Sequence, residues 1–275
     1  MSVKLHGIDV SVYQGNIDWK KVYDSGIYFA MIKSSQGCSV KEPVGNYNPF
    51  VDSKFKQNII NAYEVGIKCG VYHYVTCTTI EQAEKESDFL LSAINQYKDK
   101  ITFPVAIDIE ESRYCNRSLK EQNTKFVRIF AEKLKSAGYK PILYSYRSFL
   151  NNYIDLDALK DIDIWLAVYF TPRRTEPAPD FNNMTMWQWT SSGVTIPGIN
   201  VNVDCNIAYK NYAQIKGDLN NDGIVDSVDA LILKRYLTGS FDLTDEQKQL
   251  ADINDDGEVD SLDYLSLRRK IISAL

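Results

Sequence analysis

The sequence lacks several features that would place it at once in a functional class. No apolar run reaches the ~18 residues of a membrane-spanning helix, and the opening segment Met1–His6 has no apolar stretch of the signal-peptide type. There are only two histidines, and the five cysteines show no CxxC spacing and leave at least one thiol unpaired. We therefore expect no membrane span, no signal peptide within these residues and no zinc or redox centre.

Charge is unevenly spread along the chain. From Gly217 onward there are 13 acidic and 6 basic residues, whereas the first 216 residues hold 23 acidic and 25 basic ones. This asymmetry predicts two parts, the second of them acidic. No basic stripe is present, so we expect no nucleic-acid partner. Aromatic residues make up 12% of the chain, which suits either an ordinary core or a groove where sugar faces stack on rings.

Short apolar runs rich in β-branched and aromatic residues recur between Leu5 and Tyr209, several of them separated by helical patterns. This alternation predicts βα units and a mainly parallel sheet. Eight strands are expected, near Leu5–Val10, Tyr28–Lys33, Cys69–Tyr74, Pro104–Glu110, Ile142–Tyr146, Ile164–Tyr169, Met186–Trp189 and Val203–Ala208.

Helices are expected in the first half, at Ser53–Val65, Ile80–Gln96 and Ser118–Ala137. The last of these opens with a Ser118-x-x-Glu121 capping box and closes at Gly138. Little helix separates the later strands. The pattern therefore predicts an α/β fold, an irregular (β/α)5(β)3 barrel related to the eightfold barrel, with its active site at the carboxyl ends of the strands.

Carboxylates end several of the predicted strands. Asp108 and Glu110 lie two residues apart on one strand and so face the same way, their Cα atoms ~6.6–6.8 Å apart. Asp9 ends the first strand, and Asp204 lies at the start or middle of the last. First and last strands are neighbours in a closed barrel, so four carboxylates can meet at one mouth. Such a cluster raises one pKa and leaves another group ionised, which provides an acid and an anion. Solvated acids at strand ends are the alternative.

An ordered set of motifs over about residues 4–213 resembles glycoside hydrolase family 25. The motifs are Gly7-Ile-Asp9-Val-Ser-Val-Tyr13-Gln14-Gly15-x-Ile17-Asp18-Trp19, Phe29-Ala-Met-Ile-Lys33, Gly70-Val-Tyr72-His73-Tyr74, Asp108-Ile-Glu110, Trp165-Leu-Ala-Val-Tyr169, Trp187-Gln188-Trp189 and Val203-Asp204-x-Asn206. The resemblance implies a muramidase of the Chalaropsis lysozyme type. Such an enzyme cuts the β-1,4 bond between N-acetylmuramic acid and N-acetylglucosamine in peptidoglycan.

The resemblance also implies roles for the matching residues. Glu110 is expected to be the general acid, Asp108 to steer the attacking acetamido group of the substrate, and Asp9 and Asp204 to complete the acidic mouth. Such neighbouring-group assistance needs no protein nucleophile and no cofactor. We expect sugar contacts, with wall packing as the alternative for each ring, at Tyr13, Lys33, Tyr74, Tyr169 and Trp187.

Two positions call for comment within this resemblance. Ser35-Gln36-Gly37 stands where a Thr-Glu-Gly-like stretch is expected, so we expect the uncharged Gln36 to change a contact with substrate. His73 lies within a predicted strand. We interpret it as a buried, hydrogen-bonded histidine and not as a catalyst.

After Ile215 the pattern changes to an internal duplication, in which Asp218–Asp229 recurs 34 residues later as Asp252–Asp263. Oxygen donors stand at positions 1, 3, 5, 9 and 12, glycine stands at 6, and position 7 offers its carbonyl, as in an EF-hand loop with Asp for Glu at the end. Two structural Ca²⁺ ions are expected, on Asp218, Asn220, Asp222, Ile224, Asp226 and Asp229 and on Asp252, Asn254, Asp256, Glu258, Asp260 and Asp263.

Helices are expected after the loops, at Ala230–Leu237 and Tyr264–Ile272, so this part is a small all-α module. It resembles dockerin, the module that attaches enzymes to cohesin domains of cellulosome scaffolds. Either near-identical copy could then face cohesin; the alternative is that calcium only staples a small domain. The residues expected to contact cohesin are Ser227, Val228, Lys234, Arg235, Ser261, Leu262, Arg268 and Arg269.

The sequence thus predicts a catalytic domain at 1–213, a linker at 214–216 and a dockerin at 217–275. We expect a secreted, cellulosome-associated enzyme with a monomeric catalytic domain that acts on peptidoglycan glycan strands. Two alternatives remain: an inactive barrel that binds carbohydrate while attached to a scaffold, and another polysaccharide hydrolase such as a chitinase.

Overall fold

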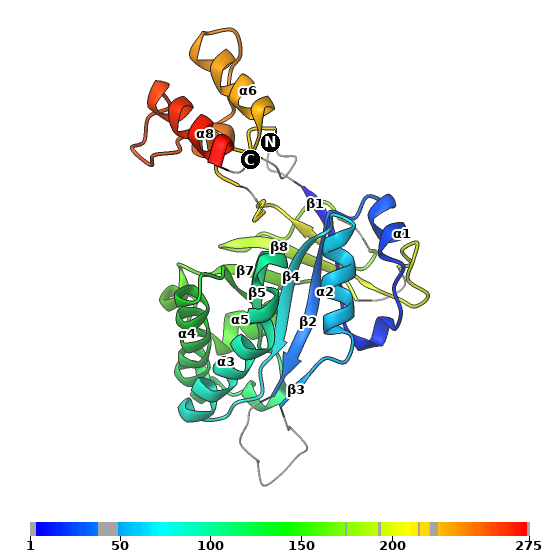
Figure 1. Ribbon diagram of the computed structural model, residues 1–275. Helices are drawn as coiled ribbons and strands as arrows, with labels where there is room; N and C mark the ends of the chain where they lie inside the picture. Colours follow the sequence, from blue (N-terminus) through cyan, green and yellow to red (C-terminus); the bar gives the residue numbers. More distant parts are fainter. Residues whose placement is uncertain are drawn as a thin grey trace. The chain divides into compact units, whose positions relative to one another are not determined.

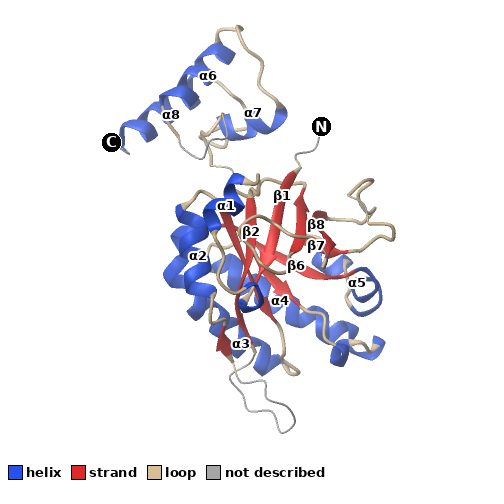
Figure 2. Ribbon diagram, turned by 90° about the vertical axis from the view of Figure 1, so that its right-hand side faces the viewer, coloured by secondary structure: helices blue, strands red, loops and turns tan. Residues whose placement is uncertain are grey.

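The computed structural model describes residues 4–37, 49–173, 175–191, 194–213, 215–220 and 225–273. The chain forms two compact units, Met1–Tyr212 and Ala213–Leu275. In the first unit strands stand at the centre and helices pack around them, whereas the second unit consists of helices and loops (Figures 1 and 2). Each unit is described separately below.

Eight strands of the first unit close into a barrel in the order β1-β9-β8-β7-β6-β5-β4-β2, with β1 paired to β2. All neighbours are parallel except β9, which runs antiparallel to both β8 and β1. A short strand, β3, extends the edge beside β2. The bounds are β1 Leu5–Val10, β2 Phe29–Gln36, β3 Phe50–Val51, β4 Lys68–Tyr74, β5 Ile101–Asp108, β6 Pro141–Tyr146, β7 Asp163–Ala167, β8 Met184–Thr190 and β9 Asp204–Ala208.

One helix follows each of the first barrel strands and none follows the last ones, which confirms the predicted (β/α)5(β)3 pattern. The helices are α1 Trp19–Asp24, α2 Phe55–Glu64, α3 Ile80–Ile94, α4 Lys120–Ser136 and α5 Arg147–Tyr153. Short 3-10 turns lie at η1 Val12–Gln14, η2 Asn95–Lys100, η3 Ser112–Tyr114, η4 Arg117–Leu119 and η5 Asp157–Leu159.

Burial on both faces explains why the central strands read as continuous apolar runs. In β5, residues Phe103 to Asp108 are all buried, because one face packs into the barrel and the other meets the helices. The barrel interior leaves little room at Gly70, where an added Cβ would lie 2.4 Å from Met31 Sδ and 2.8 Å from the Pro104 carbonyl oxygen. All eight predicted strands are present, at nearly the predicted positions.

The ends of helix α4 give one confirmation and one correction. Gly138 has φ +80° and ends the helix as predicted. The capping box at Ser118 is wrong: Ser118 lies in the preceding 3-10 turn, and its hydroxyl donates to Asn116 Oδ1 at 2.9 Å. Asn116 is the residue that caps this turn, because its side chain also accepts the Ser118 amide. The Asn116 side chain thus satisfies a backbone donor at the start of the helical segment.

The second unit contains α6 Ser227–Leu237, α7 Asp245–Ala251 and α8 Ser261–Ser273. Helices α6 and α8 confirm the two predicted ones, and α7 was not predicted. The small core gathers Leu219, Ala230, Leu233, Leu243, Leu250, Ala251 and Leu267. A core of so few apolar residues contributes little stability by itself, so we expect the loops to contribute to the stability of this unit as well.

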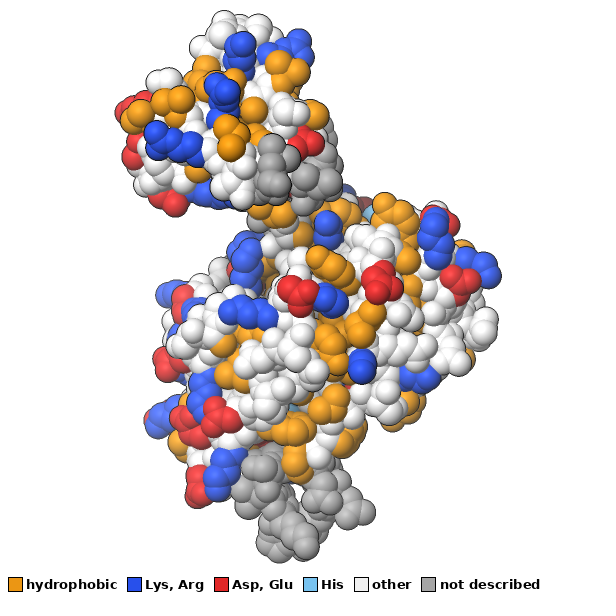
Figure 3. Space-filling view, viewed as in Figure 1, with side chains coloured by type: hydrophobic (Ala, Val, Ile, Leu, Met, Phe, Trp, Pro, Cys, Tyr) orange, Lys and Arg blue, Asp and Glu red, His pale blue; other side chains and the backbone are white. Residues whose placement is uncertain are grey.

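Three further features of the described residues bear on function. Across the described residues, no helix is both long enough and apolar enough to cross a bilayer. On the face of the first unit seen in Figure 3, basic and acidic side chains are interspersed. Cys69, Cys115 and Cys205 are free thiols. Cys38 lies outside the described residues.

Candidate active site

A polar cavity of about 180 Å³ opens at the carboxyl ends of the parallel strands. This is the end of the barrel where the sequence places the active site. All four predicted catalytic carboxylates line it together. The lining residues are Asp9, Lys33, Tyr72, Tyr74, Asp108, Glu110, Tyr144, Trp165, Gln188 and Asp204.

Strand direction brings Asp9 and Asp204 together. Asp9 lies near the end of β1, and Asp204 is the first residue of β9. Because β9 runs antiparallel, its start lies at the end of the barrel where β1 finishes, and the two residues are register partners. The mutual approach of two carboxylates at a barely exposed position is electrostatically costly. Burial, and then the charge of Asp204, raises the pKa of Asp9 to about 7, and burial raises the pKa of Asp204 to about 6.

Gln188 holds this acidic pair in place. Its Nε2 donates to Asp9 Oδ2 at 2.8 Å and to Asp204 Oδ2 at 3.4 Å. Its Oε1 accepts the hydroxyls of Tyr144 at 2.8 Å and Tyr169 at 2.5 Å. All the hydrogen-bonding capacity of the amide is therefore directed at the cavity, which fixes the orientation of the side chain.

Asn206 provides a second support from β9. Its Nδ2 donates to Asp9 Oδ2 at 2.8 Å, and its Oδ1 accepts the indole N–H of Trp165 at 2.8 Å. These donors oppose the rise in the pKa of Asp9. The amides of Gln188 and Asn206 thus both donate to Asp9, and such hydrogen bonds favour its ionised form.

Asp108 and Glu110 form the other half of the acidic lining. Asp108 ends β5, and Glu110 lies two residues beyond that end, so the predicted strand up to Glu110 was too long. Burial, with a contribution from Glu110, raises the pKa of Asp108 well above its usual value. Burial and then Asp204 raise the pKa of Glu110. Asp108 Oδ1 is buried without a hydrogen-bond partner among the described residues, which is unusual for a carboxylate oxygen.

Lys33 is the cation of the cavity. It lies on β2, and its Nζ donates to Gln36 Oε1 at 2.8 Å. Burial lowers the pKa of Lys33, while Asp108 is the strongest of the carboxylates that oppose this. In return Lys33 lowers the pKa of both Asp108 and Glu110. The uncharged Gln36 therefore lies beside the lysine and not in the acid cluster.

The predicted sugar contacts divide into three groups. Lys33 and Tyr74 line the cavity. Tyr13 and Tyr169 lie outside or at its edge with 82% and 49% of their surface exposed. Trp187 is a correction: it is 0% exposed, its indole N–H donates to the Val168 carbonyl at 2.8 Å, and its ring packs edge-on against Phe170. Trp187 therefore packs within the barrel wall, which was the alternative to a sugar contact.

Sequence reasoning missed four residues that line the cavity, and also Asn206, which supports it. Tyr72, Tyr144, Trp165 and Gln188 were not predicted as site residues, although all lie in the motifs or strands already noted. Strand alternation carried the missing signal: in Trp187-Gln188-Trp189 the middle side chain faces the barrel when its neighbours face away. His73, by contrast, is buried and hydrogen-bonded as predicted.

The second unit shows the predicted duplication in its hydrogen bonds. Asp229 accepts the backbone N–H groups of Leu219, Asn220 and Asp226 at 2.7–3.1 Å. Asp263 holds the equivalent residues of the second copy, Ile253, Asn254 and Asp260, at 2.7–3.2 Å. Both carboxylates are 0% exposed and tie the end of each loop to its start.

The fit of calcium can be judged in the second loop. Asp252 accepts the amides of Asp256 and Gly257 at 3.1 Å, and Gly257 has φ +89°, which gives the sharp turn of an EF-hand loop. The donors are hard oxygens, which fit calcium, although no group of three acidic or imidazole side chains converges among the described residues. In the first loop, Asp222 and Ile224 lie outside the described residues.

The predicted cohesin contacts all lie on the surface of α6 and α8. Val228 and Leu262, in the first turn of each helix, are 47% and 54% exposed. The two helices therefore present matching apolar side chains, with their basic residues further along each helix.

Comparisons with known proteins agree with this geometry. Residues 8–199 match the model of Glycosyl hydrolases family 25, and residues 216–272 match the Dockerin type I domain. Dockerin type I domains generally bind calcium. The Escherichia coli K12 protein YegX is 30% identical over 218 residues, which cover 75% of this chain and 70% of that protein. Lysozyme M1 of Streptomyces globisporus is 26% identical over 208 residues, or 74% and 67% of the two chains.

Solved structures give the same result. A family 25 glycosyl hydrolase from Bacillus anthracis is 28% identical with a TM-score of 0.59, covering 80% of this chain and 94% of that one. The autolysin LytC of Streptococcus pneumoniae, solved with a synthetic peptidoglycan ligand, is 27% identical with a TM-score of 0.60, covering 74% of this chain and 46% of that one. The chain belongs to glycosyl hydrolase family 25 and carries a C-terminal type I dockerin domain.

Proposed function

We propose that this glycoside hydrolase is a lysozyme that cuts the β-1,4 bond between N-acetylmuramic acid and N-acetylglucosamine in peptidoglycan. The observation that carries the proposal is the convergence of Asp9, Asp108, Glu110 and Asp204 on one cavity. Similar proteins support it: besides the Streptomyces lysozyme, the N,O-diacetylmuramidase of Arthroderma benhamiae is 26% identical over 147 residues, or 51% of this chain and 57% of that one.

Glu110 is the proposed proton donor. Its raised pKa favours the protonated form that a general acid needs, and its partly exposed side chain lines the cavity. It gives its proton to the glycosidic oxygen as the bond to the anomeric carbon breaks. Asp108, which lines the same cavity, accepts the N–H of the substrate's acetamido group and orients that group's oxygen toward the anomeric carbon.

The remaining residues of the cavity hold these groups and the sugar. Asp9 and Asp204, fixed by Gln188, keep the mouth acidic, and Asp204 sustains the raised pKa of Glu110. Lys33 and Tyr74 contact a sugar inside the cavity, and the exposed rings of Tyr13 and Tyr169 extend the binding surface. Attack by the substrate's own acetamido oxygen makes a protein nucleophile unnecessary and needs no cofactor.

We further propose that residues 1–213 form the catalytic domain, 214–216 a linker and 217–275 a docking module. The module takes two structural Ca²⁺ ions and attaches the enzyme to a cohesin domain of an extracellular, cellulosome-type scaffold. Support comes from the dockerin match and from the duplicated loops, each closed by a buried aspartate. The exposed first turns of α6 and α8 offer equivalent surfaces, so either copy can face cohesin.

The test is the chemistry of the products. Purified peptidoglycan is digested with the wild type, with Glu110→Gln and with Glu81→Gln, an exposed residue that controls for the substitution. New reducing ends are reduced with borohydride and identified by mass spectrometry. Muramic-acid ends from the wild type and Glu81→Gln, but not from Glu110→Gln, support the proposal. No ends from any protein, with binding retained, would indicate a carbohydrate-binding barrel instead.

A further inference from the structure

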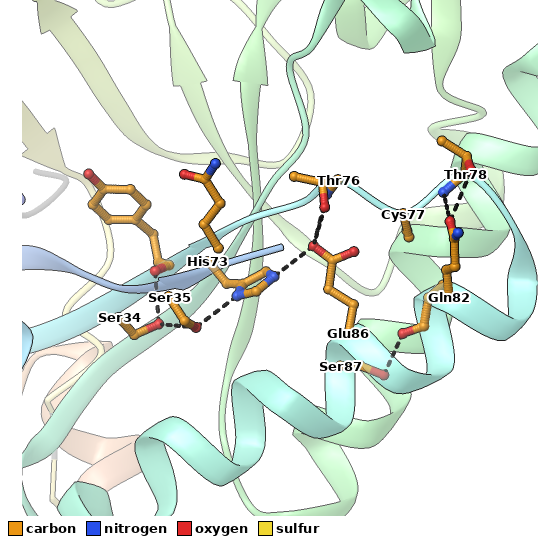
Figure 4. Close-up of polar contacts among 12 residues, drawn as sticks. Ser34, Ser35, His73, Thr76, Cys77, Thr78, Gln82, Glu86 and Ser87 are labelled. Carbon is orange, nitrogen blue, oxygen red and sulfur yellow. Dashed lines mark hydrogen bonds and ion pairs between the residues drawn. The ribbon is translucent and has the colours of Figure 1, made fainter. Parts of the chain in front are cut away.

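A set of buried polar side chains lies behind the cavity wall, between β2, β4 and α3 (Figure 4). Ser35 Oγ is 2.8 Å from His73 Nδ1, and His73 Nε2 is 3.0 Å from Glu86 Oε1. All three residues are 0% exposed and none lines the cavity. Burying an imidazole and a carboxylate is costly unless both are hydrogen-bonded, so these contacts are needed to keep His73 and Glu86 in the interior. We call these three residues the buried network.

One end of the buried network is firmly fixed. Glu86 Oε1 also accepts the backbone N–H of Thr76 at 2.8 Å and its hydroxyl at 3.3 Å. Glu86 belongs to α3 and Thr76 to the segment that joins β4 to that helix, so the carboxylate ties the helix to the end of the strand. His73 is thereby held by a group that cannot easily move.

The other end of the buried network reaches a bulge in β2. Lys33 pairs with Tyr72 of β4 and Ser35 pairs with His73, so Ser34 is an extra residue with no partner of its own in the register. The Ser34 hydroxyl donates to the Tyr72 carbonyl at 2.9 Å and lies 3.2 Å from the Ser35 hydroxyl. The irregular segment is therefore held by hydroxyl groups, and the buried network anchors one of them.

The bulge decides which side chains face the cavity. In a regular strand, positions 33 and 36 would point to opposite faces. The extra residue reverses the alternation, so Gln36 pairs with Tyr74 and lies on the same face as Lys33. Since Tyr72 and Tyr74 line the cavity, this is the catalytic face, and Lys33 Nζ can donate to Gln36 Oε1 at 2.8 Å. Bulges beside active sites often re-aim a side chain in this way.

We propose that the buried network of Ser35, His73 and Glu86 is a positioning device that locks the β2 bulge and so holds Lys33, through Gln36, in the cavity that the catalytic carboxylates line. This inference rests on the proposed function, because it assigns Lys33 a place in that reaction. The three residues do not form a catalytic triad, since none has surface that a substrate could touch. They are positioning residues that act through Lys33.

A double-mutant cycle tests the proposal on the full chain. Ser35→Ala, Lys33→Met and the double variant are compared with the wild type in kcat and KM on soluble peptidoglycan fragments. Ser87→Ala is the matched control: this hydroxyl is also buried beside Glu86 in α3, but it donates only to helix carbonyls, at 2.7 Å to Ala83 and 2.8 Å to Glu84. Crystal structures of Ser35→Ala and Ser87→Ala accompany the kinetics.

We expect Ser35→Ala to lower kcat about tenfold, since small displacements of catalytic groups have effects of that order. Ser87→Ala should change kcat less than twofold. In the Lys33→Met background the Ser35→Ala effect should vanish, because the network then has no lysine to position. Independent, multiplicative effects of the two substitutions would overturn the proposal, as would an unchanged kcat in Ser35→Ala.

The crystal structures separate this proposal from the proposed function. If the wild type releases no sugar ends, the proposed function fails, and the Ser35→Ala structure alone decides the positioning role. Loss of the bulge or of the contact between Lys33 and Gln36 supports the proposal. Retention of both, at the positions seen in Ser87→Ala, overturns it.

Discussion

Replacing Gln188 with leucine removes the amide that links the Asp9–Asp204 pair to two tyrosines of the site. Gln188 is 2% exposed and makes hydrogen bonds to Asp9, Asp204, Tyr144 and Tyr169. Leucine has a similar volume, so the main loss is polar. Each buried group left without a partner costs ~1–3 kcal/mol. Tyr144 keeps only its contact with Tyr169, Asp9 retains Asn206, and the half-exposed Tyr169 can turn to water. We expect the barrel to lose about 3 kcal/mol of unfolding free energy.

Urea unfolding followed by tryptophan fluorescence measures this loss. All four tryptophans lie before residue 190, in the first unit, so the signal reports the barrel and not the dockerin. The control is Gln57→Leu on the exposed surface of α2, which should stay within ~0.5 kcal/mol of the wild type. An unchanged m-value would show that the comparison is valid. A loss below ~1 kcal/mol for Gln188→Leu would refute the view that this amide holds the acidic pair.

Three further predictions follow from particular contacts. Lys33→Met should shift the alkaline limb of the kcat–pH profile to higher pH. Glu110 acts while protonated, so activity is lost as pH rises through its raised pKa, and Lys33 lowers that pKa. An alkaline limb that stays in place or moves to lower pH contradicts this prediction. EDTA should lower the melting temperature of the second unit in far-UV circular dichroism and leave the tryptophan transition unchanged, because every predicted donor lies in the dockerin; a moved tryptophan transition would argue against it. Asn116→Ala should cost ~1 kcal/mol in urea unfolding and Ser118→Ala less than ~0.5, because Asn116 accepts the Ser118 amide; the reverse order would restore the capping box at Ser118.

The barrel was predictable because its strands carry a strong local signal. Both faces of β5 are buried, so its apolar run stands out from the sequence. The short helices α1, α5 and α7 escaped prediction, since six or seven residues give too few turns for a helical period to show. Ser118 misled because a serine three residues before a glutamate has the capping pattern, whatever the preceding turn does.

The candidate site was predictable only in part. The carboxylates Asp9, Asp108, Glu110 and Asp204 end or begin strands, and strand ends meet in a barrel. Trp187 was expected to contact sugar, but strand alternation turns its neighbour Gln188 into the barrel instead. The bulge at Ser34 has no sequence signal of its own, because it depends on pairing with a strand nearly forty residues away.

The central claim is that Glu110 protonates the leaving oxygen, and leaving-group dependence tests it most directly. The wild type and Glu110→Gln are assayed on peptidoglycan and on an aryl glycoside of the muramyl saccharide, whose phenolate leaves without a proton. We predict that kcat falls at least ~100-fold on peptidoglycan, in line with the usual contribution of general acid catalysis, but far less on the aryl glycoside. Equal losses on both substrates, or full turnover of peptidoglycan by Glu110→Gln, would contradict the assignment.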